Sequence, residues 1–283
     1  MLSRRAFVAG GLAAASTLSV STAFAAPLRK VRETGVLKVA VYRDFAPWSW
    51  KEGEAFTGID VDLGKALAAR LGLKAEIMDF MADESADDDL RNMIWRGSLI
   101  GGGVADIMLH VPYDPQFAKQ NDRVAIVAPY YREGFALACS REVDCEVPPP
   151  QFKGKRLAAE LDSIPDFYLT GSFGGVLRGD VRHEMSAKAA LDLIPADKAD
   201  VVMASRAQVE FAMAQPSGKS FIPRKGPLPA LPSAGWDVGI AVRDDSRDLG
   251  DAVEELIVAM RADRSLDPIF ARYGVTPKAP LRG

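Results

Sequence analysis

The sequence predicts an α/β protein made of two lobes. Short apolar runs rich in Val, Ile and Ala alternate along the chain with segments whose apolar residues recur at helical spacing. Such alternation is typical of βαβ units and of a mainly parallel sheet. The 283 residues exceed the usual size of one domain, so we expect two lobes of roughly 100 to 150 residues each.

Residues 1–25 have the features of a signal peptide. Arg4 and Arg5 precede an apolar or small stretch over residues 8–22, and Ala23-Phe24-Ala25 is a small-x-small cleavage site. The paired arginines favour the twin-arginine route, although Sec signals also carry basic pairs. The apolar part is shorter than the ~20 residues of a spanning helix. We therefore expect export to the periplasm and no membrane insertion.

The composition favours neither nucleic-acid binding, nor catalysis, nor a metal site. Loss of the signal peptide removes two arginines and no acid, which changes the net charge from -3 to about -5. The two histidines, His110 and His183, lie far apart and form no Ser-His-Asp or Cys-His pattern. Neither has a ligand spacing from the cysteines. We expect a protein that is not an enzyme and has no metal and no cofactor.

Cys139 and Cys145 are the only cysteines of the chain and are close in sequence. In an exported protein this spacing favours a local disulfide that closes the turn between them. The alternative is two free thiols, one of which would be buried beside the predicted strand 135–138.

The first elements follow one another as a βαβ unit. Residues 37–42 predict a strand, and an aromatic loop, Pro47-Trp48-Ser49-Trp50, follows it. Residues 61–71 predict a helix and residues 74–80 the next strand, in a right-handed crossover. Residues 87–95 predict a second helix, because its leading acids suit the positive end of a helix dipole.

The stretch from residue 104 to 131 predicts two buried strands around a polar connector. Residues 104–109 form one apolar run, and residues 124–128 form a second run that Pro129 stops. Ligands of α/β proteins bind beyond the carboxyl ends of strands, so residues 110–114 are a candidate site. Residues 129–131 would lead into the other lobe.

The α/β pattern begins again after Tyr131. We expect strands over residues 134–138, 200–204 and 236–242, and an irregular proline-rich rim over residues 221–233. The predicted helices span residues 186–194, 205–214 with Ser205 as N-cap, 249–260, and a short segment around 269–273.

Eight short segments stand in a characteristic order along the mature chain. They are V-L-K-V-A-V from residue 36, P-W-S-W from 47, F-T-G-I-D-V-D-L-G-K-A-L-A from 56, A-D-I-M from 105, A-P-Y-Y from 128, F-K-G-K-R-L-A from 152, A-D-V-V-M-A from 199 and G-I-A-V from 239. This order resembles the periplasmic solute-binding proteins of family 3, the amino-acid-receptor type.

The resemblance implies the bilobal periplasmic-binding-protein fold of type II. In this fold two α/β lobes are joined by two crossing strands and close over a ligand as a hinge. Residues 27–130 and 243–283 would form lobe one, and residues 131–242 would form lobe two. The resemblance implies binding rather than catalysis.

Three positions depart from the way in which family 3 binds an amino acid. The family places an arginine after the A-D-I strand to pair with the ligand carboxylate, and Tyr113 and Asp114 stand there in this chain. Ser205 replaces the acid of lobe two, and Asp162 lies in the turn that normally carries a small hydroxyl residue. Because an unpaired buried carboxylate costs several kcal/mol, these changes disfavour an ordinary amino-acid receptor.

Further segments resemble one branch of the family. D-D-L-R-N-M-I-W-R-G from residue 88, the glycines 101–103, L-H-V-P from 109 and A-P-Y-Y-R-E from 128 resemble the J-type accessory proteins of quinoprotein methanol dehydrogenases, including the lanthanide-dependent type. This resemblance implies an accessory or chaperone of such a dehydrogenase. The alternative is a receptor that delivers a small polar solute, such as an amino acid or amine, to an ABC permease.

The candidate cleft residues have more than one possible role. Trp48 and Trp50 follow a strand and can stack on a ligand or pack in the core. His110 ends its predicted strand at the cleft, where a pH-sensitive contact and a structural role both remain open. The full set of candidates is Trp48, Trp50, His110, Tyr113, Asp114, Asp162 and Ser205.

Overall fold

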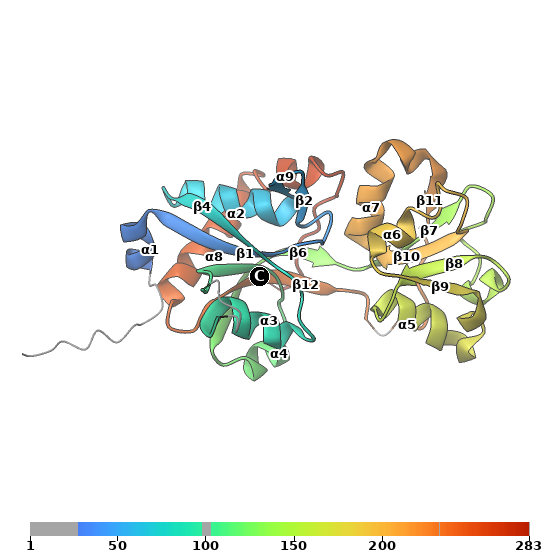
Figure 1. Cartoon of the computed structure of the whole chain (residues 1–283), viewed down its shortest axis with the longest axis horizontal. Helices are drawn as coiled ribbons and strands as arrows, with labels where there is room; N and C mark the ends of the chain where they lie inside the picture. Colours follow the sequence, from blue (N-terminus) through green and yellow to red (C-terminus); the bar gives the residue numbers. More distant parts are fainter. Residues whose placement is uncertain (1–27, 98–102, 232, 283) are drawn as a thin grey trace, which may run out of the picture.

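The computed structural model describes residues 28–97, 103–231 and 233–282, which form two α/β lobes arranged along the longest axis of the molecule (Figure 1). The predicted signal peptide and glycines 101–102 lie outside the described residues. Among the helices of the described residues, none is long and apolar enough to cross a membrane.

Twelve strands form two large sheets and one small hairpin in the described part of the chain. The strands are β1 Val36–Tyr42, β2 Trp50–Glu52, β3 Ala55–Thr57, β4 Lys74–Phe80, β5 Ile107–Pro112, β6 Val124–Glu133, β7 Phe135–Ser140, β8 Leu157–Glu160, β9 Val181–Glu184, β10 Val201–Ser205, β11 Phe221–Pro223 and β12 Trp236–Arg243.

The sheets are covered by helices on both faces. The α-helices are α1 Leu28–Thr34, α2 Ile59–Arg70, α3 Ala86–Leu90, α4 Pro115–Gln120, α5 Ile164–Gly171, α6 Ala187–Leu191, α7 Arg206–Ala214, α8 Arg247–Ala262 and α9 Asp267–Ala271. The π-helical turn η1 Arg91–Trp95 continues α3, and the 3₁₀ turns are η2 Pro149–Phe152, η3 Ser172–Gly175, η4 Arg178–Asp180 and η5 Pro216–Ser220.

The sheet of lobe one has the strand order β4-β1-β5-β12-β6. β1 is parallel to β4 and β5, so the predicted βαβ unit is confirmed. β12, which comes late in the chain, lies antiparallel between β5 and β6. Lobe one is therefore built from two separate parts of the sequence.

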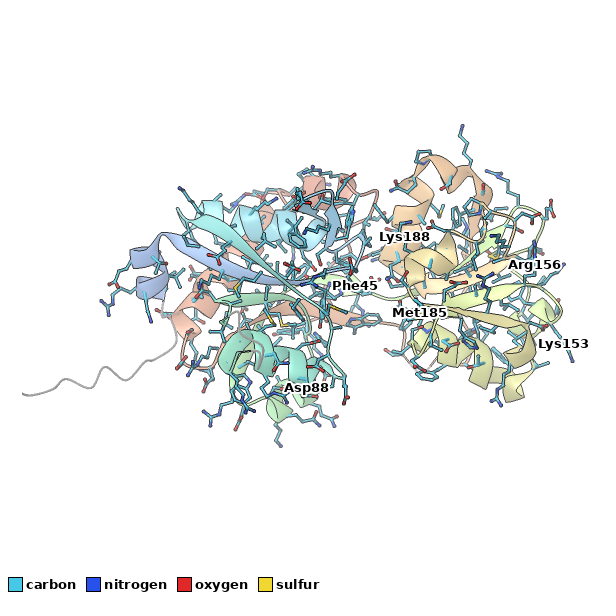
Figure 2. All side chains as sticks on the ribbon, in the orientation of Figure 1. Phe45, Asp88, Lys153, Arg156, Met185 and Lys188 are labelled. Atoms are coloured by element: carbon cyan, nitrogen blue, oxygen red, sulfur yellow. A yellow bond between two sulfur atoms is a disulfide. The ribbon has the colours of Figure 1, made fainter. Side chains whose placement is uncertain are left out.

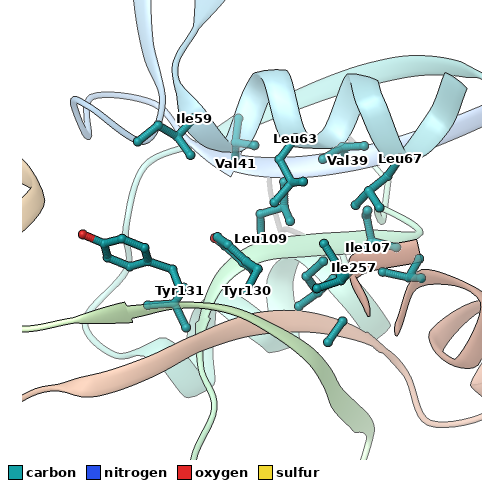
Figure 3. Packing of buried hydrophobic residues seen from close by; sticks show 14 of the residues in the cluster. Val39, Val41, Ile59, Leu63, Leu67, Ile107, Leu109, Tyr130, Tyr131 and Ile257 are labelled. Atoms are coloured by element: carbon teal, nitrogen blue, oxygen red, sulfur yellow. The ribbon is translucent and has the colours of Figure 1, made fainter. Parts of the chain in front are cut away.

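Alternate residues of β1 pack into two different cores. Val39 and Val41 pack with Leu63 and Leu67 of α2 and with Ile257 of α8 (Figure 3). Ala40 of the same strand instead belongs to the cluster formed by α3 and η1. Burial on both faces explains why this strand is a continuous apolar run in the sequence.

The first predicted strand of the 104–131 stretch is displaced along the chain. β5 begins at Ile107 instead of residue 104 and continues through His110 to Pro112. Before the strand, Asp106 accepts the Lys38 backbone N–H on its carboxylate at 2.8 Å. His110 has a φ of 62° and forms an irregularity in the pairing with β12, which still pairs with Val111 and Pro112.

The second predicted strand of this stretch is also corrected. β6 continues through Pro129 to Glu133, whereas the sequence predicted that Pro129 would stop it. A proline is tolerated there because β6 is the edge strand of its sheet. The register shifts beside Ala128, whose φ is 52°.

The sheet of lobe two has the order β11-β7-β10-β8-β9. One face packs against α5 through Leu137, Val201 and Met203, and the other packs against α6 and α7. A disulfide joins Cys139 of β7 to Cys145 in the turn that follows. The predicted strands at 134–138 and 200–204 and the helix at 205–214 are confirmed to within two residues.

The chain crosses between the lobes next to two glycines. Gly134 follows β6, and Gly235 precedes β12 with a φ of 136°. A Cβ atom on Gly235 would lie 2.0 Å from the Glu133 carbonyl oxygen, so only glycine fits. The positions of these two glycines favour crossings between the lobes near residues 134 and 235. The lobe boundaries at 130/131 and 242/243 stay predictions.

A third segment, residues 276–282, runs along the crossing strands. The Thr276 N–H donates to Glu210 of α7 at 2.7 Å, and the Lys278 carbonyl accepts the Arg132 N–H at 2.9 Å. The Leu281 and Arg282 N–H groups donate to the Asp237 carboxylate at 3.1 Å. This C-terminal strap connects both lobes to the crossing strands.

Several elements were not predicted from the sequence. The connector after β5 contains α4, and the rim at 221–233 contains the short strand β11, which pairs with β7. The hairpin of β2 and β3, helix α5 and strand β9 were also missed. The predicted helix at 186–194 is shorter, because α6 ends at Leu191.

Candidate functional site

A cavity of about 520 Å³ lies between the two lobes. Its lining residues are Tyr42, Arg43, Asp44, Phe45, Met81, Ala82, His110, Glu160, Met185 and Trp236. Most of these residues end or follow β1 and β4 of lobe one, or β8 and β9 of lobe two, and His110 lies within β5. The cavity thus lies where carboxyl ends of parallel strands meet, the usual ligand position in α/β sheets.

The rim of this interlobe cleft carries two exposed methionines, beside the exposed Arg43 and Asp44. Met81 of lobe one is 71% exposed and Met185 of lobe two is 85% exposed. Figure 2 shows Phe45 on the side of lobe one that faces lobe two, and Met185 on the facing side of lobe two. Leu161, which is 45% exposed, adjoins the Met185 side because its N–H donates to the Glu184 carbonyl.

The floor of the cleft is a buried polar cluster below His110. Asp60 is 1% exposed and accepts a 2.7 Å hydrogen bond from the Tyr130 hydroxyl. The Tyr130 oxygen in turn accepts the backbone N–H of His110 at 3.1 Å. Burial, reinforced by the Asp60 charge, raises the pKa of Tyr130 well above its ordinary value. The phenol therefore stays protonated as the donor to Asp60.

Gly58 makes this position of Asp60 possible. Its φ is 129°, and a Cβ atom there would lie 2.2 Å from the Trp48 carbonyl oxygen. The close approach lets that carbonyl accept the Asp60 N–H at 2.8 Å, at the start of α2. The T-G-I-D segment thus sets a carboxylate below the cleft.

The contact between His110 and Asp60 fixes which ring nitrogen carries a proton. His110 Nδ1 lies 3.3 Å from Asp60 Oδ2, and neither atom makes a well-aligned hydrogen bond with a described residue. A proton on Nδ1 is required there, because two acceptors would otherwise repel each other. In the neutral ring Nε2 is then an acceptor, and His110 lines the cleft.

The charged residues of the cleft leave two carboxylates unpaired. Arg43 donates through Nε to Asp79, whereas no ion pair joins Asp44 or Glu160 to another described residue. Glu160 Oε2 accepts the Ala187 N–H at 3.1 Å. Burial raises the pKa of Glu160. At a pH above the raised pKa of Glu160, both carboxylates are ionised and the local charge of the cleft is negative.

The two candidate tryptophans have different positions. Trp48 is fully buried and packs on His110 and Tyr131, with ring centroids 4.4 and 4.9 Å apart. Trp50 lines a second cavity of about 350 Å³ between the lobes, where it packs on Phe211 of α7 at 5.3 Å. Trp48 thus supports the ring of His110 from below, and Trp50 contacts the other lobe.

The remaining candidates lie outside the lining of the His110 cavity. Tyr113 and Asp114 line a separate cavity with Arg282, and Asp114 is the N-cap of α4. Asp162 is exposed, with a φ of 59°, in the turn before α5. Ser205 caps α7 in a capping box with Gln208. Of the seven candidates, the structure thus brings His110 alone to this cavity.

The lining residues that were missed share one sequence signal. Tyr42, Met81, Glu160 and Met185 each stand at the last residue of a predicted or observed parallel strand or directly after it. The carboxyl end of β5 predicted residues 110–114, and the end of β1 predicted the tryptophans of the loop that follows it. The last residue of β1, Tyr42, and the first residue after β4, Met81, carry the same signal.

Residues 37–92, which contain the first βαβ unit, match the family described as bacterial extracellular solute-binding proteins, family 3. Among curated proteins, none matches the chain.

Solved structures share the arrangement of both lobes. An ancestral cationic amino acid solute-binding protein, AncCDT-1, has 19% identity over 87% of this chain and 98% of its own, with a TM-score of 0.69. This chain has the two-lobed fold of periplasmic binding proteins. A mutant of the arginine-binding protein of T. maritima has 20% identity over 87% and 98% of the chains, with a TM-score of 0.59.

The binding-protein fold serves more than one purpose among the similar structures. A histidine kinase sensor domain described as similar to periplasmic binding proteins has 19% identity over 86% of this chain and 98% of its own, with a TM-score of 0.60. AncCDT-1 is also described as a precursor of cyclohexadienyl dehydratase. In this fold, ligands are enclosed between the lobes, where the His110 cavity lies.

The lining of the cleft contains one arginine. It is Arg43, whose Nε donates to Asp79. Asp79 balances the charge of this guanidinium, so a carboxylate in the cleft would meet no arginine that lacks an ion pair among these lining residues. Within the described residues, no group of three His, Cys, Asp or Glu side chains could hold a metal ion.

Proposed function

We propose that this protein is an exported, non-catalytic binding protein that holds a segment of a partner protein in the interlobe cleft. The partner that the resemblance suggests is a quinoprotein methanol dehydrogenase, for which the protein would act as a periplasmic accessory or chaperone.

The observation that supports this proposal best is the pair of exposed methionines at the rim of the cleft. Met81 and Met185 expose 71% and 85% of their surfaces on opposite sides of it. Exposed apolar side chains grouped around a cavity are typical of protein interaction sites. Methionine is well suited to such sites, because its flexible thioether adapts to irregular partner surfaces.

The chemistry of the cleft also favours a segment of protein over a free amino acid. A free amino acid brings a carboxylate, and the lining offers Asp44 and Glu160 together with an arginine whose charge Asp79 balances. Burial of that carboxylate without a partner would cost several kcal/mol. A peptide segment has no such charge within its chain.

The proposal is tested by binding to an immobilised, purified quinoprotein methanol dehydrogenase. Met185→Asp puts a charge on the rim and should weaken binding about tenfold or more, as expected for an apolar contact in an interface. The matched control is Val258→Asp, since Val258 is 57% exposed on α8 and is not among the lining residues of the cleft. Biolayer interferometry measures both dissociation constants.

Two results would contradict the proposal. One is the absence of binding by the unmodified protein to apo and holo dehydrogenase. The other is an equal loss of binding in Met185→Asp and Val258→Asp, which would place the contact outside the cleft. Urea unfolding of both variants verifies that lobe two of Met185→Asp and lobe one of Val258→Asp remain folded.

A second candidate is a receptor that delivers a small amine or amino acid to an ABC permease. The unpaired carboxylates of Asp44 and Glu160 favour it, as does the similarity to proteins named for cationic amino acids. A solute present at 100 times its dissociation constant would add about 2.7 kcal/mol of stability. A thermal shift with one amine, without dehydrogenase binding, would favour this role.

A further inference from the structure

We infer that the cleft holds its occupant through a cationic N–H group, a primary ammonium or a guanidinium, carried on an apolar stem. This inference rests on the proposed function and specifies which chemistry the bound segment presents. In a partner protein the group would be a lysine or arginine side chain that enters between Met81 and Met185.

Several polar atoms inside the cleft are hydrogen-bond acceptors. In the neutral ring His110 Nε2 is an acceptor, because Nδ1 keeps its proton toward Asp60. Glu160 uses Oε2 for the Ala187 N–H, and Oε1 makes no hydrogen bond with a described residue. Asp44 is exposed and adds a second carboxylate. An occupant that donates several hydrogen bonds would satisfy these atoms together.

Two donors of the lining are engaged elsewhere. The Tyr42 hydroxyl donates to Asp89 at 2.8 Å, and the Arg43 Nε donates to Asp79, whose charge balances the guanidinium. The indole N–H of Trp236 is uncharged and does not offset the two carboxylates. A cation therefore gains Coulomb energy in the cleft, whereas an anion would meet unpaired negative charge.

The order of polar and apolar groups through the cleft matches the shape of a long cationic side chain. The rim is formed by Met81 and Met185, while His110 on the floor is only 9% exposed. Lysine and arginine carry an apolar stem and a charged tip, so their stems would lie against the rim and their tips near Glu160. Phe45 and Trp236 provide aromatic faces for the cation.

Two carboxyl variants with a matched control test the inference. Glu160→Gln keeps the acceptor for Ala187 and removes the charge, and Asp44→Asn removes an exposed charge that has no described ion pair. Glu142→Gln is the control, because Glu142 is exposed in the turn between the two cysteines. The probes are the pentapeptides acetyl-Ala-Leu-Lys-Leu-Ala-amide and its norleucine analogue, titrated by calorimetry.

The lysine peptide should bind the unmodified protein at least tenfold more tightly than the norleucine peptide, which keeps the stem and lacks the charge. Glu160→Gln and Asp44→Asn should each remove much of this preference, and Glu142→Gln should keep it. Free n-butylamine provides the second arm. If it binds as tightly as the lysine peptide, the cation inference stands and its source is a small amine.

The inference and the proposed function fail in different ways. Equal binding of both peptides would overturn the inference that the occupant is cationic. The loss of dehydrogenase binding in Met185→Asp would still support the proposal that the partner binds in the cleft. If neither peptide binds, the dehydrogenase itself is the probe. Unchanged binding of the dehydrogenase to Glu160→Gln and Asp44→Asn would then overturn the inference.

Discussion

Replacement of Asp237 by alanine should release the C-terminal strap and destabilise the protein. Asp237 is 3% exposed and accepts the Arg132 guanidinium on Oδ1 at 3.1 Å. Its carboxylate also accepts the backbone N–H groups of Leu281 and Arg282 at 3.1 Å. One carboxylate thus joins β12, β6 and the strap.

The expected loss of stability follows from these contacts. Breaking a fully buried ion pair costs roughly 3–5 kcal/mol. The Arg132 side chain is 24% exposed, and Leu281 and Arg282 are exposed, so water can replace part of the lost bonding. We expect Asp237→Ala to lower the free energy of unfolding by about 3 kcal/mol.

Urea unfolding measures this loss, and amide hydrogen exchange locates it. Exchange at residues 276–282 should accelerate at least tenfold, since their anchor is gone. Asp251→Ala on the exposed face of α8 is the control and should change stability by less than about 0.5 kcal/mol. A loss in Asp237→Ala below about 1 kcal/mol, with unchanged exchange in the strap, would refute the reasoning.

Three further predictions concern lobe two and the crossing strands. Burial raises the pKa of Glu133 above its ordinary value of 4.5, so the stability that its proton provides is present at low pH and lost as the pH rises through the folded pKa. Glu133→Gln should therefore gain stability relative to the unmodified protein as the pH increases above about 4.5 in urea titrations; a constant difference would contradict this. Ser205→Ala removes the capping box with Gln208 and should cost about 1 kcal/mol in urea unfolding, whereas Ser205→Thr, which keeps a hydroxyl, should cost less. Reduction of the disulfide between Cys139 and Cys145 should cost about 2 kcal/mol, because the loop that it closes is short; a loss above about 4 kcal/mol would mean that it also supports the core.

The sequence predicted the elements whose apolar pattern reflects burial. β1, α2, β4, β10, α7 and α8 were found because their apolar spacing matches the faces that they bury. The order of these elements was also sufficient to recognise two lobes. Which face of an element is buried depends on where its apolar side chains lie, so the composition and spacing of the sequence predict it.

Elements that depend on backbone geometry were predicted less well. His110 and Ala128 have φ values of 62° and 52°, and at both positions the strand continues past the irregularity because β12 keeps pairing with it. No local pattern marks a non-glycine residue for this conformation. Helix α4, by contrast, was detectable, since Asp114 and Pro115 form an N-cap followed by proline.

The cleft was predicted only in part for a related reason. The strand-end rule led to His110, but the facing residues Glu160 and Met185 come from the other lobe. Their approach depends on the crossing strands and the strap, which join residues far apart in the sequence. The candidates taken from family positions, Asp162 and Ser205, instead lie at the start of helices.

The late position of β12 in the chain has a consequence for folding. β12 lies between β5 and β6, so the sheet of lobe one stays incomplete until residues 236–243 have been synthesised. All strands of lobe two lie between Phe135 and Pro223, and no strand of lobe one comes between them in the chain. Lobe two can therefore form first, from contacts among its own residues. We expect refolding in two kinetic steps, in which lobe two folds early and insertion of β12 limits the rate, because contacts between distant residues form slowly.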